Sequence, residues 1–279
     1  MLLSLLAGMS FFSSYGKPKV IYRSTQVARA PGGDDFQLAL RESLGFFDDI
    51  PVHAWQRMKN ITKEHVYHSK KHHSDDKMKE QIYFASNWDP DFSCQFQVSM
   101  GQTESDGHKW VCDPHRLEEK DDCLIFSVGS NAQFEFEIDL QRHLPNCEIH
   151  IFDPTDYSKE MWENGLNGTN YHAWGLQSEK SQGYETLLES MQLLGLTGRR
   201  IDIFKIDCEG CELYTHKDLL SQDIRQILVE VHGLNERTEP FFKDVHDAGY
   251  AIFHKEPNLY AKGTCIEFAF LKLAMEFFQ

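Results

Sequence analysis

Basic residues are scarce in this chain of 279 residues, in which 28 lysines and arginines stand against 43 aspartates and glutamates. The formal net charge is −15. A protein that grips a phosphate backbone needs clustered lysine and arginine to replace condensed counterions. This balance therefore disfavours nucleic acid and anionic membrane surfaces. We expect no nucleic-acid partner, and a small neutral or cationic substrate fits the charge better.

The N-terminus lacks an apolar run long enough to span a bilayer. Residues 2–12 are apolar but have only the length of a signal-peptide core, with no basic residue before them and no small-residue cleavage motif after them. They are consistent with a signal peptide, a membrane-anchor remnant or a buried helix. Two N-x-S/T sequons, at Asn60 and Asn167, favour a secretory setting slightly.

A zinc-binding pattern is also missing among the seven cysteines. Cys208 and Cys211 form a CxxC, but no second CxxC or histidine pair lies at zinc-finger spacing. Their acidic neighbours Asp207 and Glu209 would disfavour the thiolate that redox chemistry needs. We expect buried small residues or a local disulfide here. The odd number of cysteines excludes complete intramolecular pairing.

From residue 122 onward, short apolar or β-branched runs alternate with amphipathic stretches, which is typical of βαβ units and a parallel sheet. The fold class we expect is α/β, with a Rossmann-like sheet of seven strands whose last strand is antiparallel. The run 201–206 is almost wholly apolar and predicts a central strand with both faces covered. Strands are predicted at 123–128, 148–152, 171–174, 201–206, 224–231, 250–254 and 265–271, and a helix at 183–194.

Three segments are expected along the chain. Residues 1–33 combine the apolar start with a polar linker, residues 34–109 form a helical extension with a covering loop, and residues 110–279 contain the sheet. Two helices are expected in the extension. The acidic pair at 34–35 can cap the first and Asp49 the second.

The extension also contains two less regular stretches. In the histidine-rich segment 65–76, helical spacing would place His68 and His72 on one face, as a metal pair requires. No acidic or cysteine partner is obvious, so a solvated helix end is favoured. Residues 88–116 are rich in aspartate, glycine and aromatic residues without a clear period, which predicts the covering loop.

In open α/β sheets, ligands bind beyond the carboxyl ends of the strands, beside the first strand. Gly129, Ser130 and Asn131 lie at that place. Glycine lets the backbone pass close to a ligand, and the two polar residues favour a tight turn. Asp153 follows the second strand, at the spacing of a carboxylate that binds ribose hydroxyls. These four residues are the predicted cofactor contacts.

The dinucleotide fingerprint G-x-G-x-x-G is missing at this loop, because residues 129–134 read GSNAQF. Glu135 and Glu137 follow in the first turns of the next helix, where they would oppose a diphosphate. S-adenosylmethionine also has a ribose and an adenine, but it carries a positive sulfonium and no phosphate. The charge pattern therefore ranks S-adenosylmethionine above NAD as the cofactor.

A second group of acidic residues follows the fourth and fifth predicted strands. Asp207 and Glu209 come after the fourth strand, and Glu230 and His232 end the fifth on one face. Methyl transfer to a hydroxyl requires removal of a proton, by a side chain or with the help of a divalent metal. We predict His232, Asp207 and Glu209 as catalytic residues. Asp207 is also a candidate contact of the cofactor's amino group, and a divalent metal stays an open alternative.

Residues 110–271 resemble the FkbM-like class I methyltransferases and look closest to their eukaryotic methyltransferase-like branch. The resemblance rests on WVCDPHRL at 110–117, CLIFSVGSN at 123–131, FEFE at 134–137, IFDP at 151–154 and IDIFKIDCEGCE at 201–212. It implies a class I methyltransferase sheet in which Gly129 and Asp153 contact S-adenosylmethionine. It also implies an active site shaped by residues 207–212, and O-methylation of small molecules or sugars in a secretory or membrane-anchored setting.

The sequence departs from the family pattern at two places. Ser130 or Asn131 stands where the second glycine of the cofactor loop is usual, and the third strand lacks a clear adenine-binding acid. We predict an S-adenosylmethionine-dependent O-methyltransferase that acts on a small-molecule or glycan hydroxyl in the secretory pathway, with residues 2–12 as a candidate membrane anchor. The alternative is a catalytically inactive secreted or lumenal binding protein with the same fold. An NAD-linked oxidoreductase is disfavoured by the missing glycines.

Overall fold

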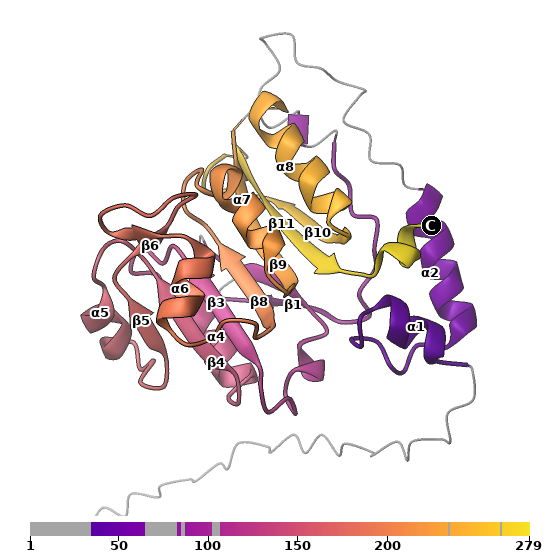
Figure 1. Cartoon of the computed structure of the whole chain (residues 1–279), viewed down its shortest axis with the longest axis horizontal. Coiled ribbons are helices and arrows are strands. Elements are labelled where there is room, and N and C mark those ends of the chain that lie inside the picture. Colours follow the sequence, from indigo (N-terminus) through magenta and orange to yellow (C-terminus); the bar gives the residue numbers. More distant parts are fainter. Residues whose placement is uncertain (1–34, 65–82, 85–86, 102–106, 234, 263) are drawn as a thin grey trace, which may run out of the picture. The chain divides into compact units, whose positions relative to one another are not determined.

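Seven strands form one mixed sheet in the order β10-β11-β9-β8-β3-β4-β5 (Figure 1). Strand β11 runs antiparallel to both of its neighbours, and the remaining adjacent strands pair in parallel. This topology confirms the predicted Rossmann-like sheet with an antiparallel last strand. The strands are β3 (Leu124–Val128), β4 (Glu148–Phe152), β5 (Asn170–His172), β8 (Ile201–Ile206), β9 (Ile224–His232), β10 (Tyr250–Pro257) and β11 (Cys265–Lys272).

The computed structural model describes residues 35–64, 83–84, 87–101, 107–233, 235–262 and 264–279. Among these residues, no helix has both the length and the apolar character needed to cross a membrane. The candidate anchor at 2–12 and the histidine-rich segment at 65–76 lie outside the described residues.

Helices cover both faces of the sheet. On one face the apolar core is shared with α6 (Leu187–Leu193), α7 (Glu212–Ser221) and α8 (Asn235–Asp247). On the other face it is shared with α1 (Gln37–Glu42), α2 (Val52–Glu64), α4 (Glu135–His143) and α5 (Ser158–Glu163).

The pleat of the strands explains why both cores are apolar. In β3, Ile125 joins the core beneath α4, whereas Leu124 and Phe126 join the core beneath α6, α7 and α8. All six residues of β8 are buried. A parallel strand with both faces covered is apolar at nearly every position, which is why the run 201–206 predicted the central strand.

Glu42 joins the two N-terminal helices. Its buried carboxylate accepts a hydrogen bond from the indole nitrogen of Trp55 at 2.6 Å and pairs with Lys59 at 2.8 Å. Phe36 occupies the N-cap position of α1 without a side-chain hydrogen bond, so the prediction that Asp35 caps this helix is wrong. No acidic side chain among the described residues caps the start of α1. Packing of α1 against α2 holds the helix instead.

The predicted covering loop contains a hairpin. Strands β1 (Gln97–Met100) and β2 (Lys109–Cys112) pair antiparallel, and the short 3₁₀ turn Pro114–Arg116 follows. A disulfide joins Cys94 to Cys112, and the side-chain amide of Gln226 bonds both the N–H and the carbonyl of Cys112 at 2.8 and 2.9 Å. Strands of four residues carry little periodic signal. Here tertiary contacts to β9 decide the conformation.

Two further elements differ from the expectation. Helix α6 begins at Leu187 rather than near residue 183, because Thr186 and Glu189 form a capping box that fixes its first turn. Residues Tyr184–Glu185 instead form β7, which pairs in parallel with β6 (Gly175–Leu176). This small pairing places Tyr184 beside the carboxyl end of the main sheet.

Six of the seven cysteines are paired. The disulfides are Cys94–Cys112, Cys123–Cys147 and Cys208–Cys211, and the remaining thiol, Cys265, is buried. Cys208 and Cys211 of the CxxC therefore form a local disulfide, which is one of the two alternatives that the sequence predicts for them. The second disulfide ties the start of β3 to the turn before β4, so it fixes the two strands that carry the predicted cofactor loop and Asp153.

Replacing both Cys123 and Cys147 with alanine should lower the free energy of unfolding by about 2–4 kcal/mol, because the unfolded chain loses a loop constraint. Urea denaturation of the oxidised proteins measures this difference. The difference should disappear when both proteins are unfolded in excess reductant. An equal stability of the two oxidised proteins would contradict this pairing.

Candidate active site

A cavity of about 360 Å³ opens at the carboxyl ends of β3, β4 and β8. Polar side chains and backbone from the predicted site line one part of it, and Phe152, Pro154, Leu176 and Tyr184 form an apolar wall. We call it the first cavity. Its place agrees with the general position of ligands in open α/β sheets.

Gly129 lets the loop after β3 approach the end of β8. It adopts a positive φ of 79°, and a Cβ atom at this position would lie 1.7 Å from the carbonyl oxygen of Asp207. No side chain fits there. The ammonium of Lys205, which is 4% exposed, donates hydrogen bonds to the carbonyls of Val128 and Gly129 and holds the loop against β8.

Asp153 fixes the same loop from the other side. Its Oδ2 accepts hydrogen bonds from the backbone N–H groups of Ser130 and Asn131, both at 3.0 Å, and from the Ser130 hydroxyl at 3.3 Å. Its Oδ1 accepts one from the N–H of Thr155 at 2.9 Å. The structure thus brings the predicted cofactor residues together around one buried carboxylate. Asp153 shapes the loop as well as lining the cavity.

The apolar wall depends on a second glycine. A Cβ atom on Gly175 would lie 2.7 Å from the ring of Tyr184, so only glycine leaves room for this ring beside the β6 backbone. Phe152 and Leu176 line the cavity beside it. The sequence interpretation missed Tyr184 because it assigned residue 184 to a helix. The arrangement forms an apolar slot suited to a planar ring.

Lys109 is a site residue that the sequence did not reveal. It comes from β2, is 1% exposed, and its Nζ lies 2.7 Å from Glu267 and 3.3 Å from Asp207. Burial alone would lower the pKa of Lys109, but the two carboxylates raise it above its ordinary value. The ammonium therefore stays charged and compensates the acids around it.

Asp207 and Glu230 form a coupled acid pair. Burial opposes ionisation of Asp207, yet Lys109 and Lys205 lower its pKa to about 2. Burial and the charge of Asp207 raise the pKa of Glu230, and a hydrogen bond between the two carboxyls raises it further. Burial likewise raises the pKa of Glu267 to about 8. The raised pKa makes Glu230 the stronger base of the two carboxyls.

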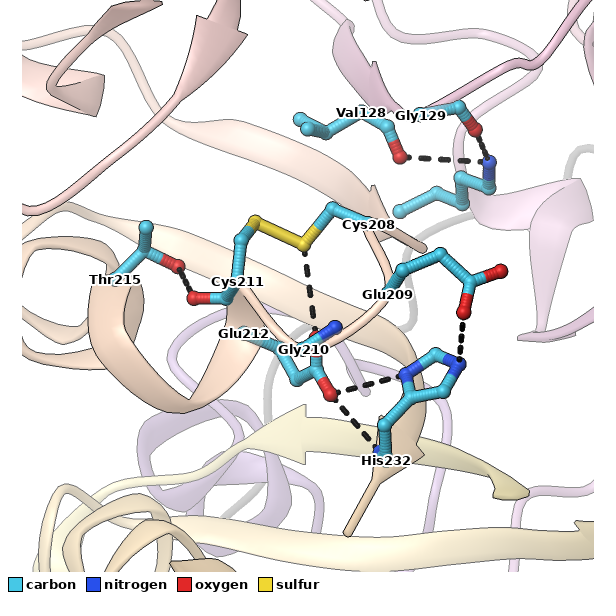
Figure 2. Close-up of a disulfide and its surroundings, with 10 residues drawn as sticks. Val128, Gly129, Cys208, Glu209, Gly210, Cys211, Glu212, Thr215 and His232 are labelled. Carbon is cyan, nitrogen blue, oxygen red and sulfur yellow. Dashed lines mark hydrogen bonds and ion pairs between the residues drawn. A yellow bond between two sulfur atoms is a disulfide. The ribbon is translucent and has the colours of Figure 1, made fainter. Parts of the chain in front are cut away.

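His232 lies between two glutamates, as Figure 2 shows. Its Nδ1 is 3.1 Å from Glu212 and its Nε2 is 3.5 Å from Glu209, and Glu212 also accepts the backbone N–H of His232 at 2.9 Å. Although burial alone would lower the pKa of His232, hydrogen bonding to Glu212 raises it to about 9. The imidazole is therefore protonated at neutral pH and accepts no proton in that state.

His232 lines a neighbouring cavity of about 480 Å³, which we call the second cavity. The two cavities adjoin at the loop after β8, because both are lined by Leu176, Tyr184, Cys208, Glu209 and Cys211. Glu230 lines the first cavity and His232 the second.

Metal ligation has two candidate groups among the described residues. The first comprises Glu230, His232 and Cys265, and the second Asp207, Glu230 and Glu267, with donor atoms within 4.8 Å of one another in each. In the second group the Lys109 ammonium already pairs with two of the three acids, Asp207 and Glu267. In the first, the imidazole is protonated. A divalent metal stays a prediction.

The family follows from residues 37–272, which match a family model described as a methyltransferase domain. The chain belongs to this methyltransferase family. No curated protein matches the chain.

Solved structures with similar folds include methyltransferases. The archaeal fibrillarin pre-rRNA processing protein of Methanococcus jannaschii has 6% identity and a TM-score of 0.42, over 64% of this chain and 89% of that one. The METTL16 methyltransferase domain has 11% identity and a TM-score of 0.39, over 88% and 92% of the two chains. An O-methyltransferase family protein from Burkholderia thailandensis has 12% identity and a TM-score of 0.38, over 57% and 53%.

The methyltransferase fold brings most of the predicted site residues to one sheet edge. Ser130 and Asp153 meet through hydrogen bonds, and Asp207 lies across the Gly129 loop from them. Glu209 is an exposed residue whose carboxylate points to His232 (Figure 2). The assignments of cofactor and catalytic roles stay predictions, as does the FkbM-like branch within the methyltransferases.

The charge on His232 gives the methyltransferase a defined pH dependence. Because the folded pKa, about 9, lies above the ordinary value of 6.5, this histidine stabilises the fold fully below pH 6.5. That contribution is lost as pH rises through 9 and amounts to about 3 kcal/mol at most. Urea unfolding of wild type and His232→Gln should show a stability difference that shrinks over this pH range. A His232 pKa near 6.5 by NMR titration would contradict the assignment.

Proposed function

We propose that this methyltransferase transfers the methyl group of S-adenosylmethionine to a hydroxyl group of a small molecule or glycan. The observation that carries the proposal is the first cavity, where a glycine loop, a buried acid and an apolar wall lie next to the carboxyl pair Asp207–Glu230.

The first cavity fits the proposed cofactor in shape and charge. The backbone of Gly129 and Ser130 lets a ligand come close to the loop, and the Asp153 carboxylate lines the cavity beside this loop. The apolar wall at Tyr184 suits the adenine ring. The surrounding acids favour a cation over a diphosphate. When bound, S-adenosylmethionine would supply an electrophilic methyl group on a positively charged sulfur.

The acid pair is the proton acceptor in this proposal. Asp207 and Glu230 both line the first cavity, and the raised pKa of Glu230 makes it the stronger base of the two. An ionised carboxylate within reach of a hydroxyl can take its proton as the oxygen is methylated. Lys109 stays charged behind the pair and holds it in place. His232, predicted as a catalytic residue, acts in this account as a fixed positive charge that orients Glu209 and the loop after β8.

The second cavity supports a glycan or other small polyol as the acceptor. Tyr214 lines this cavity with 64% of its surface exposed, beside the exposed carboxylate of Glu209. An exposed aromatic ring stacks on the C–H face of a sugar, and carboxylates accept its hydroxyl hydrogen bonds. The net charge of −15 disfavours a polyanionic acceptor such as nucleic acid.

We place the protein in the secretory pathway as part of the same proposal. Three disulfides among the described residues are typical of proteins that fold in an oxidising compartment. The sequon residue Asn167 is exposed in a turn, where a glycan can be attached. Residues 2–12 supply a candidate signal or membrane anchor.

Asp153→Ala should weaken binding of S-adenosylhomocysteine about tenfold or more, because it removes a carboxylate from the cavity and releases the N–H groups of Ser130 and Asn131. Calorimetry measures the affinity. Asp156→Ala is the matched control, since it removes an exposed acid of the same loop and should leave the affinity unchanged. Equal affinities of the two variants would remove Asp153 from the cofactor site.

Glu230→Gln should lower kcat about a hundredfold or more while the affinity for S-adenosylhomocysteine changes little, because the proton acceptor is lost and the cofactor loop is intact. Turnover is measured with methyl-labelled S-adenosylmethionine and the best hydroxyl acceptor from a panel of glycans and small alcohols. His232→Gln is the comparison and should keep measurable turnover. An active Glu230→Gln together with an inactive His232→Gln would assign the proton transfer to His232 instead.

A further inference from the structure

Glu137 has a buried carboxylate oxygen without a hydrogen-bond partner among the described residues. The side chain lies on the first turn of α4, is 1% exposed and lines the first cavity. Its Oε1 accepts a hydrogen bond from the hydroxyl of Ser127, whereas its Oε2 is buried and unsatisfied. A buried carboxylate oxygen left without a donor is costly. The geometry therefore points to a donor that arrives with a ligand.

The neighbours of Glu137 limit the chemistry of that ligand. Ser127 on β3 is the register partner of Lys205 on β8, so the carboxylate and the ammonium lie on the same face of the sheet and line the same cavity. Two of the three N–H groups of Lys205 are directed to the carbonyls of Val128 and Gly129. A negative group beside a positive one, both buried, suits a zwitterion such as an α-amino acid.

Asp207, the earlier candidate for the cofactor's amino group, is engaged elsewhere. It pairs with Lys109 at 3.3 Å and is coupled to the neighbouring carboxyl of Glu230. Asp153 is engaged by the N–H groups of the loop after β3. Among these acids, Glu137 has the oxygen that still needs a donor.

We propose that Glu137 binds the α-amino group of the amino-acid tail of S-adenosylmethionine. The inference rests on the proposed function and deepens it, because it names the residue that distinguishes a cofactor with an amino-acid tail from other adenosine compounds. Ser127 positions the carboxylate, and Lys205 supplies the charge that the α-carboxylate of the tail needs.

Three ligands separate the contribution of the amino group. S-adenosylhomocysteine has the complete tail, its decarboxylated form keeps the amino group, and 5′-methylthioadenosine has neither tail group. Glu137→Gln keeps the size of the side chain and its bond to Ser127 but removes the charge. We expect it to weaken binding of the first two ligands by about ten- to a hundredfold, and to leave the affinity for 5′-methylthioadenosine within about threefold.

Glu135→Gln is the matched control, because Glu135 lies on the same helix turn, lines the same cavity and is more exposed. It should have little effect on any of the three ligands. Calorimetry gives the affinities, and retained binding of 5′-methylthioadenosine shows that the variant is folded.

Three results would overturn the inference. An equal loss for all three ligands would mean that Glu137 only supports the fold, and unchanged binding of S-adenosylhomocysteine would remove it from the site. If folded wild type binds no S-adenosylhomocysteine, the proposed function fails together with the inference. When wild type binds S-adenosylhomocysteine normally, the second result removes the inference but leaves the proposed function standing.

Discussion

The close approach of Gly129 to the carbonyl of Asp207 is the constraint on which the site depends. It brings the loop after β3 against the end of β8, where any side chain at residue 129 would collide with backbone. Lys205 and Asp153 then hold this loop from two sides. A single backbone contact thus sets the distance between the proposed cofactor loop and the acid pair. This is why both can act on one ligand.

Buried charged groups are the second feature on which the site depends. Asp207, Glu230 and Glu267 gather where water is largely excluded. The fold tolerates them because the Lys109 ammonium lies among them and because the pKa values of Glu230 and Glu267 are raised. Lys109 comes from the β1–β2 hairpin, whose two ends the Cys94–Cys112 disulfide joins and which Gln226 anchors to β9. The N-terminal extension therefore contributes directly to the electrostatics of the methyltransferase site.

The sheet could be predicted from the sequence because its signals are local. Apolar runs such as 201–206 and the loop GSNAQF reveal strands and a ligand edge without knowledge of the fold. The hairpin, Tyr184 and Lys109 could not be predicted, since each depends on residues far apart in sequence. His232 was located correctly at the end of β9, but its charge follows from Glu212, whose approach only the folded chain reveals.

The central claim is that the first cavity binds S-adenosylmethionine rather than a dinucleotide. Calorimetric titration of the wild-type chain with S-adenosylhomocysteine, with NAD as the comparison ligand, tests it most directly. The account predicts saturable one-to-one binding of S-adenosylhomocysteine in the micromolar range and none of NAD. A folded chain that binds NAD, or that binds neither ligand, would contradict it.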